Sequence, residues 1–189
     1  KNANRLIFLS SHVVYEGIKT DKINIDEART PCPVLSYGKS KYQSELDLQE
    51  KHNDFLILRL GSTYGAPAVR WKILPNLFAR MTAIEGKIKI FGGDCLKPLV
   101  GVYDVARGMK ILGESGYNKE IFNLVNENLT VNEIAQICKK YRPNLQIEKT
   151  QDEAPNLGYS LSNQKLLKTG FEFKTNIKKE IGRMINSLY

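Results

Sequence analysis

Ser36-Tyr37-Gly38-Lys39-Ser40-Lys41-Tyr42 is the stretch around which the rest of the chain is organised. The polar residues 43–51 that follow it read as a helix, and Ser36 is a suitable N-cap for that helix. Because residues four apart share one face of a helix, Tyr37 and Lys41 are expected to point into one site. The spacing therefore predicts a phenol and an ammonium side by side, a pair suited to moving a proton to and from an alcohol or a carbonyl.

Two apolar segments flank this helix, and each is followed by small residues. Residues 5–11 read as a strand that ends in Ser10-Ser11, and residues 55–60 read as a second strand that ends before Gly61. The second segment is largely apolar rather than alternating, as expected for a strand that is covered on both faces. A strand, a helix and a strand in this order predict a parallel α/β sheet.

Together these features resemble the extended short-chain dehydrogenase/reductase superfamily, and within it the NAD-dependent epimerases and dehydratases of nucleotide sugars. The motifs that carry the resemblance are Ser10-Ser11, Tyr37-x-x-x-Lys41, Leu58-Arg59 and Tyr64-Gly65-x-Pro67. The resemblance implies a partial Rossmann-like, doubly wound parallel α/β sheet with a smaller C-terminal α/β substrate domain.

The resemblance also implies a division of the chain near residue 67. Residues 1–67 would form the C-terminal part of the dinucleotide-binding domain. Residues 68–189 would form mainly the substrate-binding domain, with residues 98–125 returning to the Rossmann sheet. Within this second part, Asp104 is expected to cap a helix, and Thr130 with Glu133 forms the pattern of a capping box.

No strand of the sequence is followed by a glycine-rich turn of the Gly-x-Gly-x-x-Gly type. The resemblance places a dinucleotide-binding half ahead of Lys1, and at about 30 residues per strand-helix-strand unit roughly 100 residues of it are missing. We therefore expect the chain to be a fragment of a longer gene product, to bind a dinucleotide poorly, and to be inactive by itself.

The resemblance assigns a role to each motif. Tyr37 would be the general acid/base, Lys41 would hold the nicotinamide ribose and stabilise the phenolate, and Ser11 would hydrogen-bond the reacting sugar oxygen. The cofactor would be NAD, with NADP left open, and Gly61 would contact it together with Tyr37 and Lys41. The residues expected to contact a nucleotide sugar are Ser11, His12, Ser62, Phe91 and Lys97.

Some positions depart from the family's patterns. His12-Val13 stands where 4,6-dehydratases carry Asp-Glu, and since a valine cannot transfer a proton, an epimerase is favoured over a dehydratase. Ser62 stands where many galactose-type epimerases carry an asparagine. Lys97 stands where an arginine commonly grips the diphosphate. A histidine at a strand end is more often an incidental residue than a proton carrier, and an aromatic residue on a short strand, such as Phe91, is more often part of the core than a partner for a nucleobase.

These observations favour an NAD-dependent nucleotide-sugar epimerase that works through a keto intermediate. The second hypothesis is a dehydrogenase or reductase of the same superfamily, which consumes NADH or NADPH. The third is a non-catalytic binding protein with the same fold. The family further implies a homodimer of the full-length protein.

The composition of the 189 residues argues against several other classes. The formal net charge is +8, but the lysines are distributed and lack interleaved aromatic residues, so a solvated basic surface explains the charge better than nucleic-acid binding. A basic cleft would also suit an anionic nucleotide sugar. No apolar run approaches the length of a membrane span. Cys32, Cys95 and Cys138 show no paired spacing, so we expect neither a metal site nor disulfides, and a cytoplasmic protein.

Overall fold

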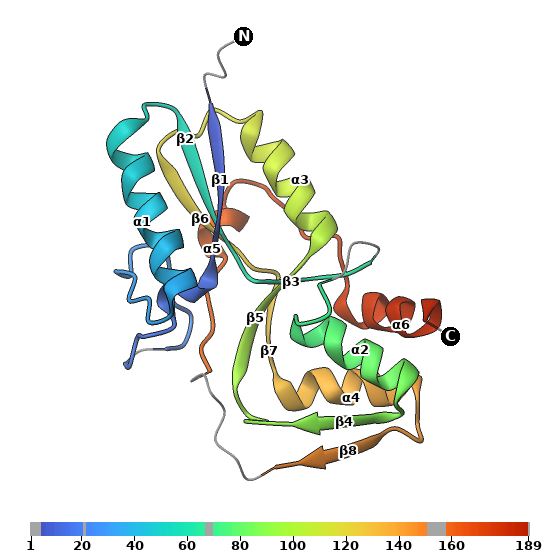
Figure 1. The fold of residues 1–189 in the computed structure, drawn as a ribbon. Coiled ribbons are helices and arrows are strands. Elements are labelled where there is room, and N and C mark those ends of the chain that lie inside the picture. The colour runs from blue at the N-terminus through green and yellow to red at the C-terminus, as the bar shows by residue number, and fades with distance from the viewer. Residues whose placement is uncertain (1–4, 21, 67–69, 151–157, 189) are drawn as a thin grey trace.

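The computed structural model describes residues 5–20, 22–66, 70–150 and 158–188. Three parallel strands form its first sheet, in the spatial order β1, β2, β6. The register pairs Ser11 with Leu60 and Leu60 with Leu124, so the three carboxyl ends lie at the same end of the sheet (Figure 1). The strands are β1 (Leu6–Ser11), β2 (Phe55–Leu60) and β6 (Glu120–Leu124).

Helices α1 (Ser36–Lys51) and α3 (Val102–Gly113) cover the two faces of this sheet (Figure 1). Alternate residues of β2 point to opposite faces. Ile57 packs in one cluster with Leu48 of α1, whereas Leu58 packs in another with Leu112 of α3. A strand buried on both faces needs apolar residues at consecutive positions, and this confirms the predicted α/β class with a covered parallel sheet.

The segment between β1 and α1 begins with a short 3-10 helix, η1 (His12–Tyr15). The polar segment that follows, over residues 16–20 and 22–35, is not wholly exposed. Ile18 and Ile25 are buried, and Ile25 forms an isolated parallel bridge with Leu161. These two apolar side chains fix an otherwise polar loop against the C-terminal part of the chain.

A second group of elements lies beyond the carboxyl ends of the first sheet (Figure 1). Strand β5 pairs in parallel with β3 and antiparallel with β7, and β4 pairs in parallel with β8. Phe78, Ile134 and Ile181 belong to the core that joins helices α2, α4 and α6. The elements are β3 (Ser62–Tyr64), α2 (Leu74–Ile84), β4 (Lys87–Ile90), β5 (Leu96–Gly101), β7 (Glu127–Thr130), α4 (Val131–Tyr141), β8 (Gln146–Lys149) and α6 (Ile177–Ser187). The short helix α5 (Gln164–Leu167) lies instead against β6 of the first sheet (Figure 1).

The capping box predicted for α4 is present. The Thr130 hydroxyl accepts a hydrogen bond from the Glu133 N–H at 3.1 Å, and the Glu133 carboxylate accepts one from the Thr130 N–H at 2.7 Å. The two residues satisfy N–H groups that the first turn of a helix leaves free. A pattern of four consecutive residues, Thr130–Glu133, is enough to encode this cap.

The prediction that Asp104 caps its own helix is wrong. Helix α3 begins two residues earlier, at Val102, and Asp104 lies within its first turn. The buried Asp104 carboxylate instead accepts hydrogen bonds from the N–H groups of Lys174 (3.0 Å) and Thr175 (2.8 Å). It therefore docks the segment that precedes α6 onto α3.

Candidate active site

A cavity of about 360 Å³ opens where β1 and β2 end. Its walls come from the β1–η1 junction, the start of α1, the β2–β3 turn and the segment before α2. The lining residues are Ser10, Ser11, His12, Val13, Tyr37, Leu60, Gly61, Ser62, Thr63, Arg70 and Ile73. In parallel α/β sheets, the carboxyl ends of the strands are the usual place for a ligand.

Tyr37 and Lys41 lie one turn apart on α1, as their spacing predicts. Tyr37 borders the cavity and is 55% exposed. The Lys41 ammonium lies 6.0 Å from the centre of the Tyr37 ring and 4.8 Å from that of Phe8. It donates a hydrogen bond to the Leu9 carbonyl at 2.8 Å, which ties the helix to β1. The structure thus brings the predicted phenol and ammonium to one side of the helix.

The start of α1 is held differently from the prediction. Ser36 is the first helical residue, and the N-cap position falls on Leu35, whose side chain makes no capping hydrogen bond. The Glu16 carboxylate instead holds the two residues that precede the helix. It accepts hydrogen bonds from the N–H groups of Val34 at 3.0 Å and Leu35 at 2.6 Å. A carboxylate at this position also complements the positive end of the helix dipole.

Ser11 and Gly61 line the cavity from the two strands. The Ser11 hydroxyl accepts a hydrogen bond from the Val13 N–H at 3.4 Å, at the start of η1. A Cβ atom at Gly61 would lie 3.0 Å from the backbone of Leu99, so this glycine lets the β2–β3 turn approach β5 closely. Close packing against β5 is therefore a sufficient reason for a glycine at position 61, apart from its predicted contact with the cofactor.

His12 is held by two hydroxyls from distant parts of the chain. Its Nδ1 lies 2.6 Å from the Tyr159 hydroxyl, and its Nε2 lies 3.1 Å from the Ser62 hydroxyl. Burial, with a smaller effect from Lys97, lowers the pKa of His12 to about 4. The imidazole is therefore neutral near pH 7. It connects η1, β3 and the 158–161 segment, and these contacts give it a structural role that an incidental strand-end residue would lack.

Lys97 and Phe91 differ in their relation to the cavity. Lys97 lies on β5, close enough to influence the pKa of His12, and burial lowers the pKa of Lys97 itself. Phe91 follows β4, is 42% exposed, and has the Lys89 ammonium 5.3 Å from its ring centre. Neither residue is among those that line the cavity, but Lys97 lies close enough to His12 to affect its pKa.

Behind the cavity lies a buried polar network that the sequence analysis missed. The Glu45 carboxylate accepts hydrogen bonds from the Arg59 guanidinium, at 2.6 Å from Nη2, and from the Ser10 hydroxyl at 2.5 Å. Arg59 also donates to the Tyr15 hydroxyl. Burial raises the pKa of Tyr15 to about 12, against the opposing effect of Arg59. Glu45 follows Lys41 by four residues, as Lys41 follows Tyr37. This regular spacing puts the three residues on one face of α1 and could have indicated that Glu45 lies near the site.

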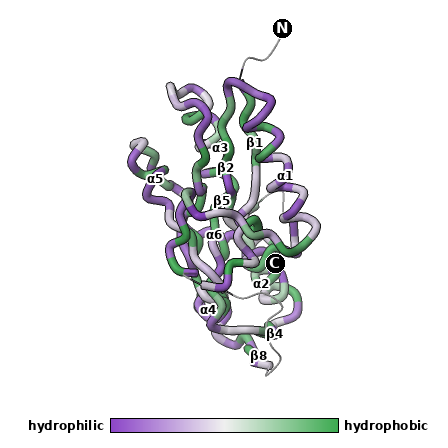
Figure 2. The backbone as a smooth tube through the Cα atoms, turned by 90° about the vertical axis from the view of Figure 1, so that its left-hand side faces the viewer, coloured by the Kyte–Doolittle hydropathy of each residue, from purple (hydrophilic) through white to green (hydrophobic). Residues whose placement is uncertain are grey.

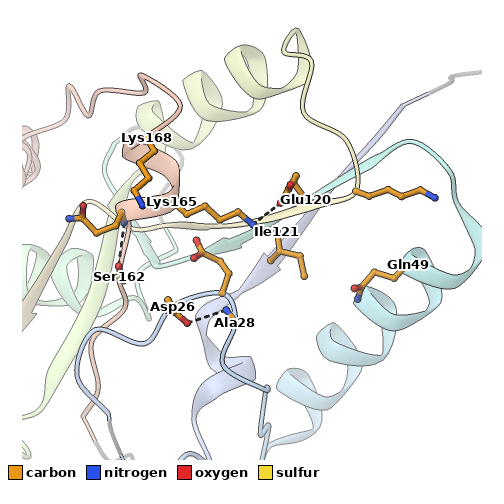
Figure 3. A pocket seen from close by; sticks show the side chains of 11 residues that line it. Asp26, Ala28, Gln49, Glu120, Ile121, Ser162, Lys165 and Lys168 are labelled. Atoms are coloured by element: carbon orange, nitrogen blue, oxygen red, sulfur yellow. Dashed lines mark hydrogen bonds and ion pairs between the residues drawn. The ribbon is translucent and has the colours of Figure 1, made fainter.

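A larger cavity, of about 520 Å³, lies along the outer side of β6 (Figure 3). Its charged groups are of both signs, and Lys165 pairs with Glu120 at 2.7 Å. The Glu27 carboxylate accepts a hydrogen bond from the Asn123 N–H on the outer edge of β6. Tyr37 lines the smaller cavity and not this groove, so we place the candidate site in the smaller cavity.

Two further features are absent from the part of the chain that the structure describes. It contains no group of three or more histidine, cysteine, aspartate or glutamate residues able to hold a metal ion. None of its helices has both the length and the apolar character needed to cross a membrane.

A model of the NAD dependent epimerase/dehydratase family matches residues 1–124. None of the curated proteins matches the chain in sequence. Many solved structures share its fold. UDP-glucose 4-epimerase from Thermotoga maritima, in complex with UDP-glucose, is 21% identical with a TM-score of 0.84, over 97% of this chain and 62% of that chain.

Two other solved structures with this fold are a complex with NADPH and a dehydratase. RMD from Pseudomonas aeruginosa, complexed with NADPH, is 18% identical with a TM-score of 0.85, over 97% of this chain and 66% of that chain. DesIV, a dTDP-glucose 4,6-dehydratase from Streptomyces venezuelae with NAD and TYD bound, is 23% identical with a TM-score of 0.82, over 96% of this chain and 59% of that chain. The chain thus spans about three fifths of the length of these proteins, and the likeness is one of fold.

Proposed function

The chain belongs to the NAD dependent epimerase/dehydratase family, and on that premise we propose that it is part of a nucleotide-sugar epimerase that uses NAD. The observation that supports the proposal is that Tyr37 and Ser11 line one cavity and that the Lys41 ammonium lies 6.0 Å from the centre of the Tyr37 ring. A proton-transfer group, a cation and a hydroxyl are thereby gathered where two parallel strands end.

The residues of this site fit the nicotinamide-ribose end of the cofactor. An ammonium has three N–H donors, and the Leu9 carbonyl takes one of those of Lys41, which leaves donors for ribose hydroxyls. When bound, NAD accepts a hydride from a sugar carbon and returns it. No glycine-rich phosphate turn occurs in these 189 residues, so they assign no site to the pyrophosphate.

The chain's own residues would position the sugar and move one proton. Tyr37 would take the proton of the reacting hydroxyl as the carbon is oxidised, and would return it when the keto sugar is reduced on its other face. Lys41 would stabilise the phenolate, and Ser11 would hydrogen-bond the same sugar oxygen. Lys97 would attract the diphosphate, and Ser62, oriented by His12, would contact the sugar.

An epimerase is favoured over a dehydratase because the expulsion of water needs a second acid and base. Val13 has no titratable group, and His12 is neutral near pH 7 with both ring nitrogens within hydrogen-bonding distance of hydroxyls. A reductase of the same superfamily is the second candidate, and the NADPH complex among the similar structures favours it. An epimerase leaves its cofactor unchanged after each turnover, whereas a reductase consumes one NADH or NADPH per product.

The substitution Tyr37→Phe tests the proposal. It removes the phenol oxygen but keeps the ring, so we expect turnover to fall by about 100-fold or more while the affinity for NAD changes little. Turnover and cofactor binding would be measured in the protein as its gene encodes it. Tyr42→Phe, on the same helix, is the matched control and should keep its activity. Retention of full turnover by Tyr37→Phe would remove the catalytic assignment.

A further inference from the structure

Helix α1 carries Tyr37 and Lys41, yet it offers little apolar surface to the sheet. Of its 16 residues only Gly38, Glu45 and Leu48 are buried, and Figure 2 shows much of the helix in the colours of hydrophilic residues. Most helices in proteins are held by the packing of an apolar stripe. In α1 a single buried leucine cannot define both the rotation and the translation of the helix, so its polar contacts must contribute.

The polar contacts of α1 with the sheet lie directly beside the cavity. Lys41 donates to the carbonyl of Leu9, and Glu45 accepts from the hydroxyl of the next residue, Ser10. On the other side, the Arg59 guanidinium of β2 reaches Glu45 through Nη2 at 2.6 Å and through Nε at 3.1 and 3.2 Å. The side chains of Glu45 and Arg59 are 0% and 3% exposed. The forked guanidinium meets the carboxylate in one defined orientation.

The Arg59 side chain is also held by a residue outside α1. It donates a hydrogen bond to the Tyr15 hydroxyl, which in turn lies 3.2 Å from the Asp26 carbonyl and 3.5 Å from the Asn123 amide oxygen. The network therefore runs from α1 through β2 to β6. A displacement of α1 along the sheet would break several charge-assisted hydrogen bonds at once.

We propose that Glu45 and Arg59 are a positioning pair that sets where Tyr37 and Lys41 stand relative to Ser11. Stability alone does not explain the pair, because an apolar pair of similar volume is often as stable as a buried ion pair. What the ion pair adds is a directional constraint one turn from Lys41 and two turns from Tyr37. The inference rests on the proposed role of Tyr37 in proton transfer.

Glu45→Gln tests the pair, because the amide keeps the shape but loses the charge. We expect kcat to fall by about 100-fold, the effect of a misplacement near 1 Å, with the KM for the nucleotide sugar changed by less than about threefold. The primary deuterium isotope effect at the oxidised sugar carbon should rise, because the chemical step becomes slower than product release. In the cofactor-free protein, amide hydrogen exchange should quicken in residues 36–51 but not in α4.

A second variant separates positioning from stability. Glu45→Met combined with Arg59→Met removes both charges and leaves flexible apolar side chains of similar size. We expect this double variant to recover thermal stability relative to Glu45→Gln, yet to keep the low kcat. Ile134→Ala, in the core around α4, is the control for general destabilisation and should change exchange in residues 131–141 while leaving kcat near the wild-type value.

The outcomes distinguish this inference from the proposed function. If the double Met variant turns over like the wild type, or if Ile134→Ala lowers kcat as much as Glu45→Gln does, the pair is only structural and the inference is overturned. If Tyr37→Phe has full activity as well, the proposed function fails with it. Loss of kcat in Tyr37→Phe together with unchanged kcat in both Glu45 variants would overturn the positioning role alone. If Glu45→Gln does not fold, the kcat of the double Met variant decides whether the pair has a positioning role.

Discussion

The His12 imidazole is uncharged near neutral pH because burial, and to a smaller extent Lys97, lowers its pKa to about 4. Its two nitrogens lie within hydrogen-bonding distance of Tyr159 and Ser62, so the ring needs no charge to satisfy its polar atoms. Protonation would place a cation beside another cation in a buried site. At the scale of single residues, the environment of His12 therefore suits a fixed, neutral hydrogen-bonding bridge.

The lowered pKa of His12 predicts that the folded protein is less stable in mild acid than at neutral pH. The unfolded chain takes up a proton at His12 near pH 6.5, whereas the folded chain does so only near pH 4. The unfolded state thus binds more protons between these values, and the free energy of unfolding falls as the pH falls through that window. At pH 5 the loss from His12 should be about 2 kcal/mol relative to pH 7, measured by urea unfolding.

The variants His12→Gln and His52→Gln check the assignment. His12→Gln should lose most of this pH dependence, whereas His52→Gln, exposed at the end of α1, should retain it. An unchanged acid response in His12→Gln would show that another group titrates in this range.

At the scale of elements, Asp104 joins two segments that are 70 residues apart. Burial by itself would raise the pKa of Asp104, but the N–H groups of Lys174 and Thr175 and the Arg107 side chain outweigh it and hold the pKa below its usual value. The carboxylate therefore stabilises the fold above its unfolded-state pKa, near 3.8, and this contribution is lost as the pH falls through its lower folded value.

We predict that Asp104→Asn lowers the free energy of unfolding by about 2 kcal/mol, because a neutral amide replaces a charged acceptor of backbone N–H groups. Chemical denaturation at neutral pH measures the loss. Asp47→Asn, on the exposed side of α1, is the control and should cost less than about 0.5 kcal/mol. Equal losses in the two variants would mean that Asp104 contributes no more than a surface carboxylate.

At the scale of the whole molecule, the formal net charge of +8 would favour the approach of the anionic nucleotide sugar that we propose as substrate. Lys97 is a half-buried cation that lies close enough to the site to lower the pKa of His12. Since mobile ions screen exposed charges over about 10 Å at 0.1 M salt, distributed lysines should affect binding mainly at low salt.

We therefore predict that Lys97→Ala raises the KM for a nucleotide sugar by about tenfold, the effect of one lost charged hydrogen bond, and that this difference persists at high salt. Steady-state kinetics at several salt concentrations would measure it. Lys168→Ala, in the groove along β6, changes the net charge equally and should raise KM only at low salt. A response of Lys97→Ala that matches Lys168→Ala at every salt concentration would contradict a direct contact.

Much of the fold and part of the site could be predicted from the sequence, because the signals are local. The apolar run of β2, the four-residue spacing of Tyr37 and Lys41, and the Thr130–Glu133 capping box each depend on residues within a few positions of one another. Backbone geometry converts such short patterns directly into a strand, a helical face or a cap.

Only the tertiary structure decided which partner each buried polar group has. His12 meets Tyr159 across 147 positions, Asp104 caps a distant segment instead of its own helix, and Glu45 pairs with Arg59 on another element. A buried donor or acceptor must be satisfied, but many residues of the chain could satisfy it equally well. The choice follows from which elements the folded chain brings together, and that is a property of the packed molecule rather than of any one stretch.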